Sequence, residues 1–126
     1  MYIYYDQKTD YLEVISKKCR NYSKMVDDGV FEIYAESSKK RIGYGLEDAS
    51  QYIDEVDFFD PFVKLSIYIK MARLKRGLSQ AQMAKKMKIG LLPYQRLESG
   101  GNNPTLKTLL KVKQILPEVN LEKIAA

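Results

Sequence analysis

Two pairs of aspartates have the type and spacing that could support metal binding or acid–base chemistry. Asp6 and Asp10 flank a turn-rich segment, and Asp27 is followed directly by Asp28. Paired carboxylates can hold a divalent cation or share a proton. Aspartates also accept hydrogen bonds from nearby backbone amides in turns, and this role explains both pairs better. We therefore predict a protein that is not an enzyme and that needs no metal and no cofactor.

The other reactive groups have no sequence partner for catalysis. The chain has no histidine, and its one cysteine, Cys19, cannot form an internal disulfide. The segment Gly43-Tyr44-Gly45 lacks the downstream glycine and the helix of a dinucleotide-binding loop. No apolar run approaches the roughly 18–20 residues that cross a bilayer, and the polar start does not resemble a signal peptide. The cytoplasm is the expected location.

Charge is divided unevenly along the 126 residues. Residues 1–60 carry 8 Lys and Arg against 13 Asp and Glu, whereas residues 61–126 carry 13 against 3, so the net charges are −5 and +10. Such a division predicts two modules with different partners, the basic one binding nucleic acid. We predict an acidic β-rich domain over 1–53, an acidic linker over 54–60 and a basic helical domain over 61–126. Solvated surface charge is the alternative explanation of both halves.

These domains define an α+β fold class. Short apolar runs separated by turns predict four strands in a small antiparallel meander. The expected strands are residues 2–5, 11–15, 30–35 and 41–46. Residues 47–55 could form a short helix or part of the linker.

After Pro61 the apolar residues recur at helical spacing, which predicts a bundle of four to five helices. Asp60 is expected to cap the first helix, Gly77 to end it and Ser79 to cap the second. A third helix is expected over 91–98. The fourth is expected to begin near Thr105, to end before Pro117 and to bury Leu106, Leu109, Leu110, Val112 and Ile115. The tail over 119–124 is expected to form a fifth helix or a dimer edge.

Three stretches of the basic half resemble the helix-turn-helix of XRE/Cro-type repressors: 77–87, 94–100 and 103–109. The resemblance extends over about residues 62–116. It implies that the third helix enters the major groove of DNA. The positions that match the DNA-contacting surface are Gln80, Leu91, Leu92, Gln95, Arg96, Asn102, Asn103, Thr105 and Lys107.

Each group of these positions has an implied role. Gln80 would lie near the DNA backbone, and Arg96 would read a base, since a guanidinium pairs bidentately with guanine. The segment from Asn102 to Lys107 would meet phosphate. Arg73 and Glu98 match a pair that forms a structural salt bridge.

Two departures from the repressor pattern stand out. Lys88 occupies a turn position that is usually glycine. Leu91 and Leu92 begin the third helix, where polar residues are usual, and leucines offer no hydrogen bonds to bases. The leucines could instead pack against a partner, or DNA binding could be weak.

The acidic half resembles a family of small β-rich bacterial proteins of unknown function, through residues 5–12 and 26–30. Its members look like antitoxins, and the basic half is also similar to the helix-turn-helix of HicB-type antitoxins. These resemblances imply a type II antitoxin. Its acidic domain would neutralise a small basic toxin, and its basic domain would bind double-stranded operator DNA to autoregulate transcription, as a homodimer or higher homo-oligomer. The alternatives are a stand-alone regulator with a ligand-sensing or dimerising N-terminal domain, and an adaptor that has lost DNA binding.

Overall fold

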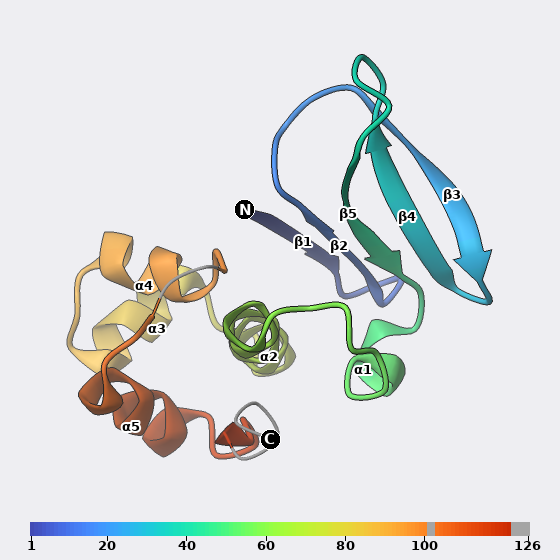
Figure 1. Cartoon of the computed structure of the whole chain (residues 1–126). Coiled ribbons are helices and arrows are strands. Elements are labelled where there is room, and N and C mark those ends of the chain that lie inside the picture. The colour runs from blue at the N-terminus through green and yellow to red at the C-terminus, as the bar shows by residue number, and fades with distance from the viewer. Residues whose placement is uncertain (101–102, 122–126) are drawn as a thin grey trace. The chain divides into compact units, whose positions relative to one another are not determined.

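The computed structural model describes residues 1–100 and 103–121, which form parts of two compact units (Figure 1). The N-terminal unit comprises residues 1–56 and the helical unit residues 57–126. The α+β class is confirmed. None of the helices in the described part of the chain is both long and apolar enough to cross a lipid bilayer.

The N-terminal unit is built on one antiparallel sheet of five strands. The strands are β1 (Tyr2–Asp6), β2 (Tyr11–Ile15), β3 (Asn21–Asp27), β4 (Val30–Ala35) and β5 (Arg41–Leu46). Their order in the sheet is β1-β2-β5-β4-β3, so the last strand of the chain lies between β2 and β4 (Figure 1). The sheet therefore differs from the expected four-stranded meander in both strand number and strand order.

The unexpected strand is β3, at one edge of the sheet. Of its seven residues only Tyr22 is half-buried, and Met25 and Val26 are more than half exposed. An exposed edge strand needs no apolar alternation, which is the signal that sequence reading depends on. Its backbone pairing with β4 and the stacked rings of Tyr22 and Tyr34 hold it in place.

Close approach explains a glycine in the central strand. A Cβ atom at Gly45 would lie 2.3 Å from the hydroxyl oxygen of Tyr11, whose ring makes an edge contact with Phe31. A larger residue would force the Tyr11 ring to move, and glycine leaves room for that ring to cross the strand. Gly45 therefore allows close packing within the sheet, and it is not part of a phosphate-binding loop.

A single turn of helix, α1 (Ala49–Tyr52), follows the sheet. Asp10 anchors it: the carboxylate accepts hydrogen bonds from the Ser50 amide (3.0 Å), the Ser50 hydroxyl (2.6 Å) and the Tyr5 hydroxyl (2.5 Å). Burial alone would raise the pKa of Asp10, but these hydrogen bonds lower it below its ordinary value. This aspartate therefore has a structural role.

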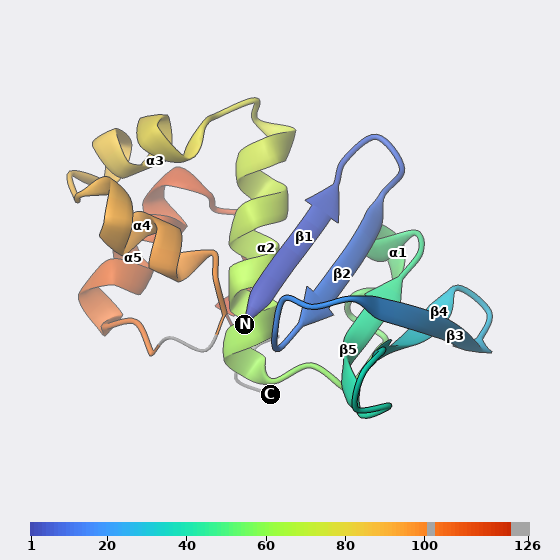
Figure 2. The same ribbon diagram turned by 90° about the horizontal axis from the view of Figure 1, so that it is seen from above.

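The helical unit contains four helices, α2 (Pro61–Lys75), α3 (Gln80–Met87), α4 (Leu91–Leu97) and α5 (Leu106–Ile115). In Figure 2, α3, α4 and α5 lie on one side of the long helix α2. The expected caps are confirmed: Asp60 accepts from the Phe62 amide, and Ser79 forms a reciprocal capping box with Gln82. Gly77 follows the end of α2 with φ +67°, a conformation that glycine adopts at little cost.

Apolar side chains from α2–α5 form one core. Its buried members are Leu65, Ile69, Ala72, Met83, Ala84, Met87, Tyr94, Leu97, Val112, Leu116 and Val119. The prediction that Leu106 and Leu110 are buried is wrong, because they are 71% and 55% exposed. They lie four positions apart, on a face of α5 that turns away from the core. Val119 of the expected tail segment is in the core, and residues 122–124 lie outside the described part.

Candidate nucleic-acid interface

Helices α3 and α4 and the turn between them form the candidate interface. Lys88 ends α3 in the left-handed conformation, with φ 58° and ψ 43°. The amide of Ile89 closes the turn by donating to the carbonyl of Ala84 at 3.0 Å. Gly90 is the N-cap of α4 and provides no side-chain hydrogen bond. The turn requires a positive φ at position 88, which explains why glycine is usual there, and a lysine adopts that conformation at a cost.

A buried ion pair fixes α4 against α2. The Nε atom of Arg73 donates to Oε2 of Glu98 at 2.6 Å, and its Nη2 donates to Oε1 at 3.0 Å. The third donor, Nη1, reaches the carbonyl of Leu78 at 2.8 Å. The side chains are only 8% and 2% exposed. A pair with this two-pronged geometry fixes helix orientation, a structural role.

Tyr94 adds a further donor to the same carboxylate. Its ring is fully buried, and its hydroxyl donates to Oε2 of Glu98. Burial, and then this hydrogen bond, raise the pKa of Tyr94 far above its ordinary value. For Arg73, burial would lower the pKa, but the hydrogen bonds to Glu98 raise it. The network therefore favours a neutral tyrosine and a charged arginine.

Two of the predicted DNA-contacting residues join this network. Gln80, the first residue of α3, donates from Nε2 to Oε1 of Glu98 at 3.3 Å. Gln95 of α4 donates from Nε2 to Oε1 of Gln80 at 3.2 Å. Gln95 is exposed and Gln80 is half-buried. A line of hydrogen bonds thus runs from the buried carboxylate to the surface.

The other predicted residues of α4 lie at the surface. Leu91 and Leu92 are 46% and 59% exposed, and Arg96 is also exposed. Tyr94 and Leu97, three positions apart, face the core. The exposed residues of α4 therefore share the side of the helix that is turned away from the core.

The predicted phosphate contacts lie at the start of α5. Asn103, Thr105 and Lys107 are exposed. Thr105 is also the N-cap, since its hydroxyl accepts from the Thr108 amide at 3.2 Å. Asn102 lies outside the described residues.

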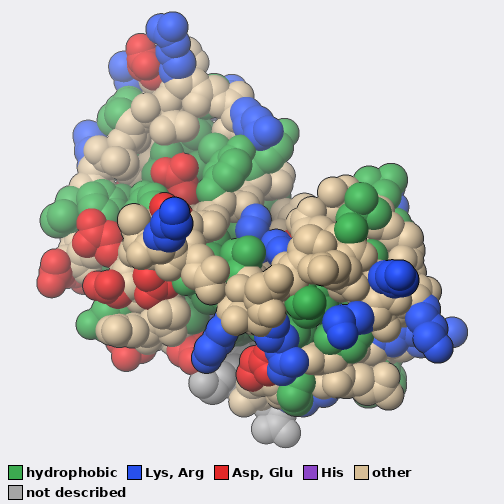
Figure 3. Space-filling model, turned by 180° about the vertical axis from the view of Figure 1, so that it is seen from behind, with side chains coloured by type: hydrophobic (Ala, Val, Ile, Leu, Met, Phe, Trp, Pro, Cys, Tyr) green, Lys and Arg blue, Asp and Glu red, His purple; other side chains and the backbone are tan. Residues whose placement is uncertain are grey.

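Three further lysines near the turn were not among the predicted DNA contacts. Lys85, Lys86 and Lys88 are exposed at the end of α3 and at its cap. Their clustering in the sequence was the available signal, because a basic run beside a DNA-reading helix is a ready phosphate contact. Figure 3 shows Lys and Arg side chains spread over the helical unit and Asp and Glu side chains gathered on the N-terminal unit.

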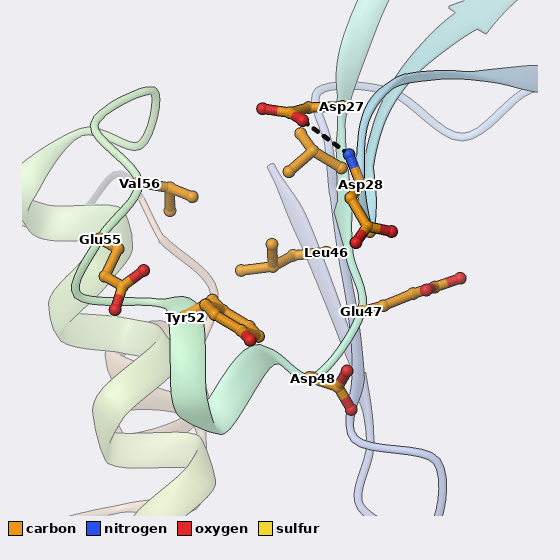
Figure 4. Close-up of a pocket in the computed structure, with 10 residues that line it drawn as sticks. Asp27, Asp28, Leu46, Glu47, Asp48, Tyr52, Glu55 and Val56 are labelled. Atoms are coloured by element: carbon orange, nitrogen blue, oxygen red, sulfur yellow. Dashed lines mark hydrogen bonds between the residues drawn. The ribbon is translucent and has the colours of Figure 1, made fainter.

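The N-terminal unit carries an acidic pocket of about 310 Å³. Its apolar part includes Leu46, Tyr52 and Val56, whose side chains point toward its centre in Figure 4. The carboxylates around it are those of Asp27, Asp28, Glu47, Asp48 and Glu55. Among the described residues, no Lys or Arg lines the pocket. No cluster of three potential metal ligands occurs in residues 1–100 and 103–121.

Comparison with known proteins agrees with the geometry of the helical unit. Residues 69–124 match the model of a helix-turn-helix family. Proteins of this family are DNA-binding transcription regulators, and the match indicates such a regulator here. It covers α3, the turn, α4 and α5. No curated protein and no solved structure gives a significant match.

Proposed function

We propose that the helical unit represses transcription by placing α4 in the major groove of operator DNA. The observation that carries the proposal is the outward face of α4, where Gln95 and Arg96 are exposed on a helix that the buried Arg73–Glu98 pair holds against α2. Amide and guanidinium groups are the side chains best suited to reading base edges. The net charge of +10 after residue 60 supports attraction to phosphate.

The leucines at the start of α4 fit this role. Leu91 and Leu92 offer apolar contact to thymine methyl groups. One helix-turn-helix reads a half-site of a few base pairs, so operator binding calls for a homodimer or higher homo-oligomer on a two-fold site. The regulator would act on its own promoter.

For the N-terminal unit we propose the binding of a small basic protein, a toxin that this chain neutralises as an antitoxin. The acidic pocket favours this function over ligand sensing, because five carboxylates surround an apolar centre. Such a surface suits a basic segment with an apolar side chain, and complementary potentials speed association.

DNA binding is tested by mobility shift of the full chain with its own upstream DNA. Arg96→Ala should weaken binding to the operator much more than to unrelated DNA, whereas Lys107→Ala should weaken both alike. Lys17→Ala, an exposed change in the N-terminal unit, is the matched control and should bind as the wild type does. If neither Arg96→Ala nor Lys107→Ala alters the shift, the interface is placed wrongly.

Neutralisation is tested by co-expressing the chain with the protein encoded beside its gene. Wild-type chain should rescue growth. The triple variant Asp28→Asn, Glu47→Gln, Glu55→Gln should rescue poorly, and Glu36→Gln, an exposed carboxylate outside the pocket, should rescue fully. Full rescue by the triple variant would remove the pocket from the proposal. A harmless neighbour would contradict the antitoxin role and favour the stand-alone regulator.

A further inference from the structure

The line of hydrogen bonds from the interior to Gln95 has a fixed polarity. An ionised carboxylate can only accept hydrogen bonds. Oε1 of Glu98 already accepts from Nη2 of Arg73, so Gln80 can approach it only with its NH₂ group. The Glu98 carboxylate therefore determines which end of the Gln80 amide is oxygen and which is nitrogen, an assignment that is otherwise ambiguous for a glutamine.

The orientation of Gln80 in turn fixes that of Gln95. With the NH₂ group of Gln80 on Glu98, its carbonyl oxygen faces α4 and can only accept. Gln95 must therefore meet it with its own NH₂ group, as it does at 3.2 Å. The Oε1 atom of Gln95 accepts no hydrogen bond from the described residues. An acceptor oxygen and the second N–H of the same amide remain available on the outer side of α4.

We propose that this relay from Glu98 through Gln80 makes Gln95 a specificity-determining residue for adenine. The proposal rests on the proposed function, since it assigns a base preference to the DNA-binding face. Adenine presents an N6 amino donor beside its N7 acceptor in the major groove. The oxygen of Gln95 accepts from N6, and its second N–H donates to N7.

The other bases fit this orientation less well. Guanine presents two acceptors, N7 and O6, so its O6 would face the Gln95 oxygen without a proton between them. Thymine presents an acceptor and a methyl group, and cytosine a single donor. An isolated glutamine could turn its amide over to suit guanine. Gln95 can do so only by giving up its hydrogen bond to Gln80, so Gln80 acts as a positioning residue.

The experiment uses the full chain and a DNA site that it selects from a pool of random duplexes. Each adenine of that site is then replaced in turn by purine, which lacks the N6 amino group, and by guanine. For the wild type, one adenine should show a loss of about tenfold on either replacement. Gln95→Ala should make binding insensitive to that replacement, while Gln114→Leu, an exposed change at the far end of α5, should behave as the wild type does.

Two variants of Gln80 test the relay itself. Gln80→Leu removes the polarity, so the preference for adenine over guanine should fall to about twofold or less. Gln80→Lys provides donors only, so it should turn the Gln95 amide over and shift the preference toward guanine. The quantity compared is the ratio of affinities for adenine and guanine at one base pair. A lost phosphate contact or a small loss of stability would weaken both affinities alike and leave this ratio unchanged.

The outcomes separate this inference from the function on which it rests. Selection of no DNA site by the wild type would overturn the proposed function and this inference with it. Selection of a site whose preferences are unchanged by Gln95→Ala, or unchanged by both Gln80 variants, would overturn the relay and leave the regulator intact. A selected site that contains no adenine sensitive to Gln95→Ala would do the same.

Discussion

Arg73 and Glu98 are 25 residues apart in the sequence and share two hydrogen bonds inside the helical unit. The pair connects α2 to the end of α4, and through Gln80 the carboxylate also contacts the start of α3. Because the Glu98 carboxylate binds groups from α2, α3 and α4, its loss should lower the stability of the unit and change the orientation of the proposed DNA-binding face.

Breaking this pair should be costly. Arg73→Met leaves the Glu98 carboxylate buried without its cation, and we expect the free energy of unfolding of the helical unit to fall by about 3–5 kcal/mol. Urea unfolding followed by circular dichroism measures the loss. Arg76→Met is the matched control, because the Arg76–Glu118 pair has similar geometry but is more than 40% exposed at both side chains, and its loss should cost about 1 kcal/mol or less. Equal losses would show that burial does not set the value of the pair.

Tyr94→Phe should destabilise the unit and change its behaviour in alkali. The variant loses one donor to an ionised carboxylate, so a cost of about 1.5–3 kcal/mol is expected at neutral pH. The pKa of Tyr94 is raised in the folded state, so the stability it contributes is present below the ordinary tyrosine pKa of 10.0 and is lost as the pH rises above that value. Unfolding measured against pH should show this alkaline loss in the wild type and less of it in Tyr94→Phe. Identical profiles would contradict the assignment.

Lys88→Gly should stabilise the protein. At φ 58° the lysine carries the cost of a left-handed conformation, and glycine removes about 1 kcal/mol of it. The effect is seen as a higher midpoint of thermal unfolding. Lys86→Gly, an equal loss of charge inside α3, should lower the midpoint, because glycine costs about 1 kcal/mol within a helix. If Lys88→Gly also destabilises, the side chain of Lys88 makes a contact worth more than the strain.

Asp10→Asn should loosen the attachment of α1 to the sheet. An amide cannot accept all the hydrogen bonds from Ser50 and Tyr5, and a cost of about 1–2 kcal/mol is expected. Hydrogen exchange of the Ser50 amide should accelerate. Asp28→Asn, an exposed carboxylate in the same unit, should leave that rate unchanged.

The lowered pKa of Asp10 also predicts an acid dependence. Its contribution to stability is present above the ordinary pKa of 3.8 and is lost as the pH falls through the lower folded-state value. In the wild type, Ser50 exchange should therefore gain an acid-induced acceleration below about pH 4 that Asp10→Asn lacks. The absence of any such difference would contradict the structural role of Asp10.

The helical unit was largely predictable because its signals are local. Caps and terminators such as Asp60, Gly77 and Ser79 act within four residues of themselves, so the sequence contains the whole interaction. The predicted burial of Leu106 and Leu110 is wrong, because an apolar residue type does not by itself mean a core position and α5 presents only one of its faces to the other helices.

The sheet order and the relay were beyond sequence reasoning for a common physical reason. The pairing of β2 with β5 joins residues about thirty positions apart, and the hydrogen bond from Gln80 to Glu98 also joins distant positions. The Arg73–Glu98 pair was expected only because of the family resemblance. Periodicity reports which way a residue faces within its own element, but it does not report which element lies opposite. β3 escaped prediction for a different reason, because its exposed residues show no apolar alternation.

The position of β5 between β2 and β4 has a consequence for how the molecule comes into being. As the chain leaves the ribosome, residues 1–40 can form only two separate hairpins, β1–β2 and β3–β4, each with a bare edge. An isolated hairpin is marginally stable in water. The sheet can therefore be completed only after β5 has been synthesised. Until then the unpaired edges of β2 and β4 can pair with strands of other chains.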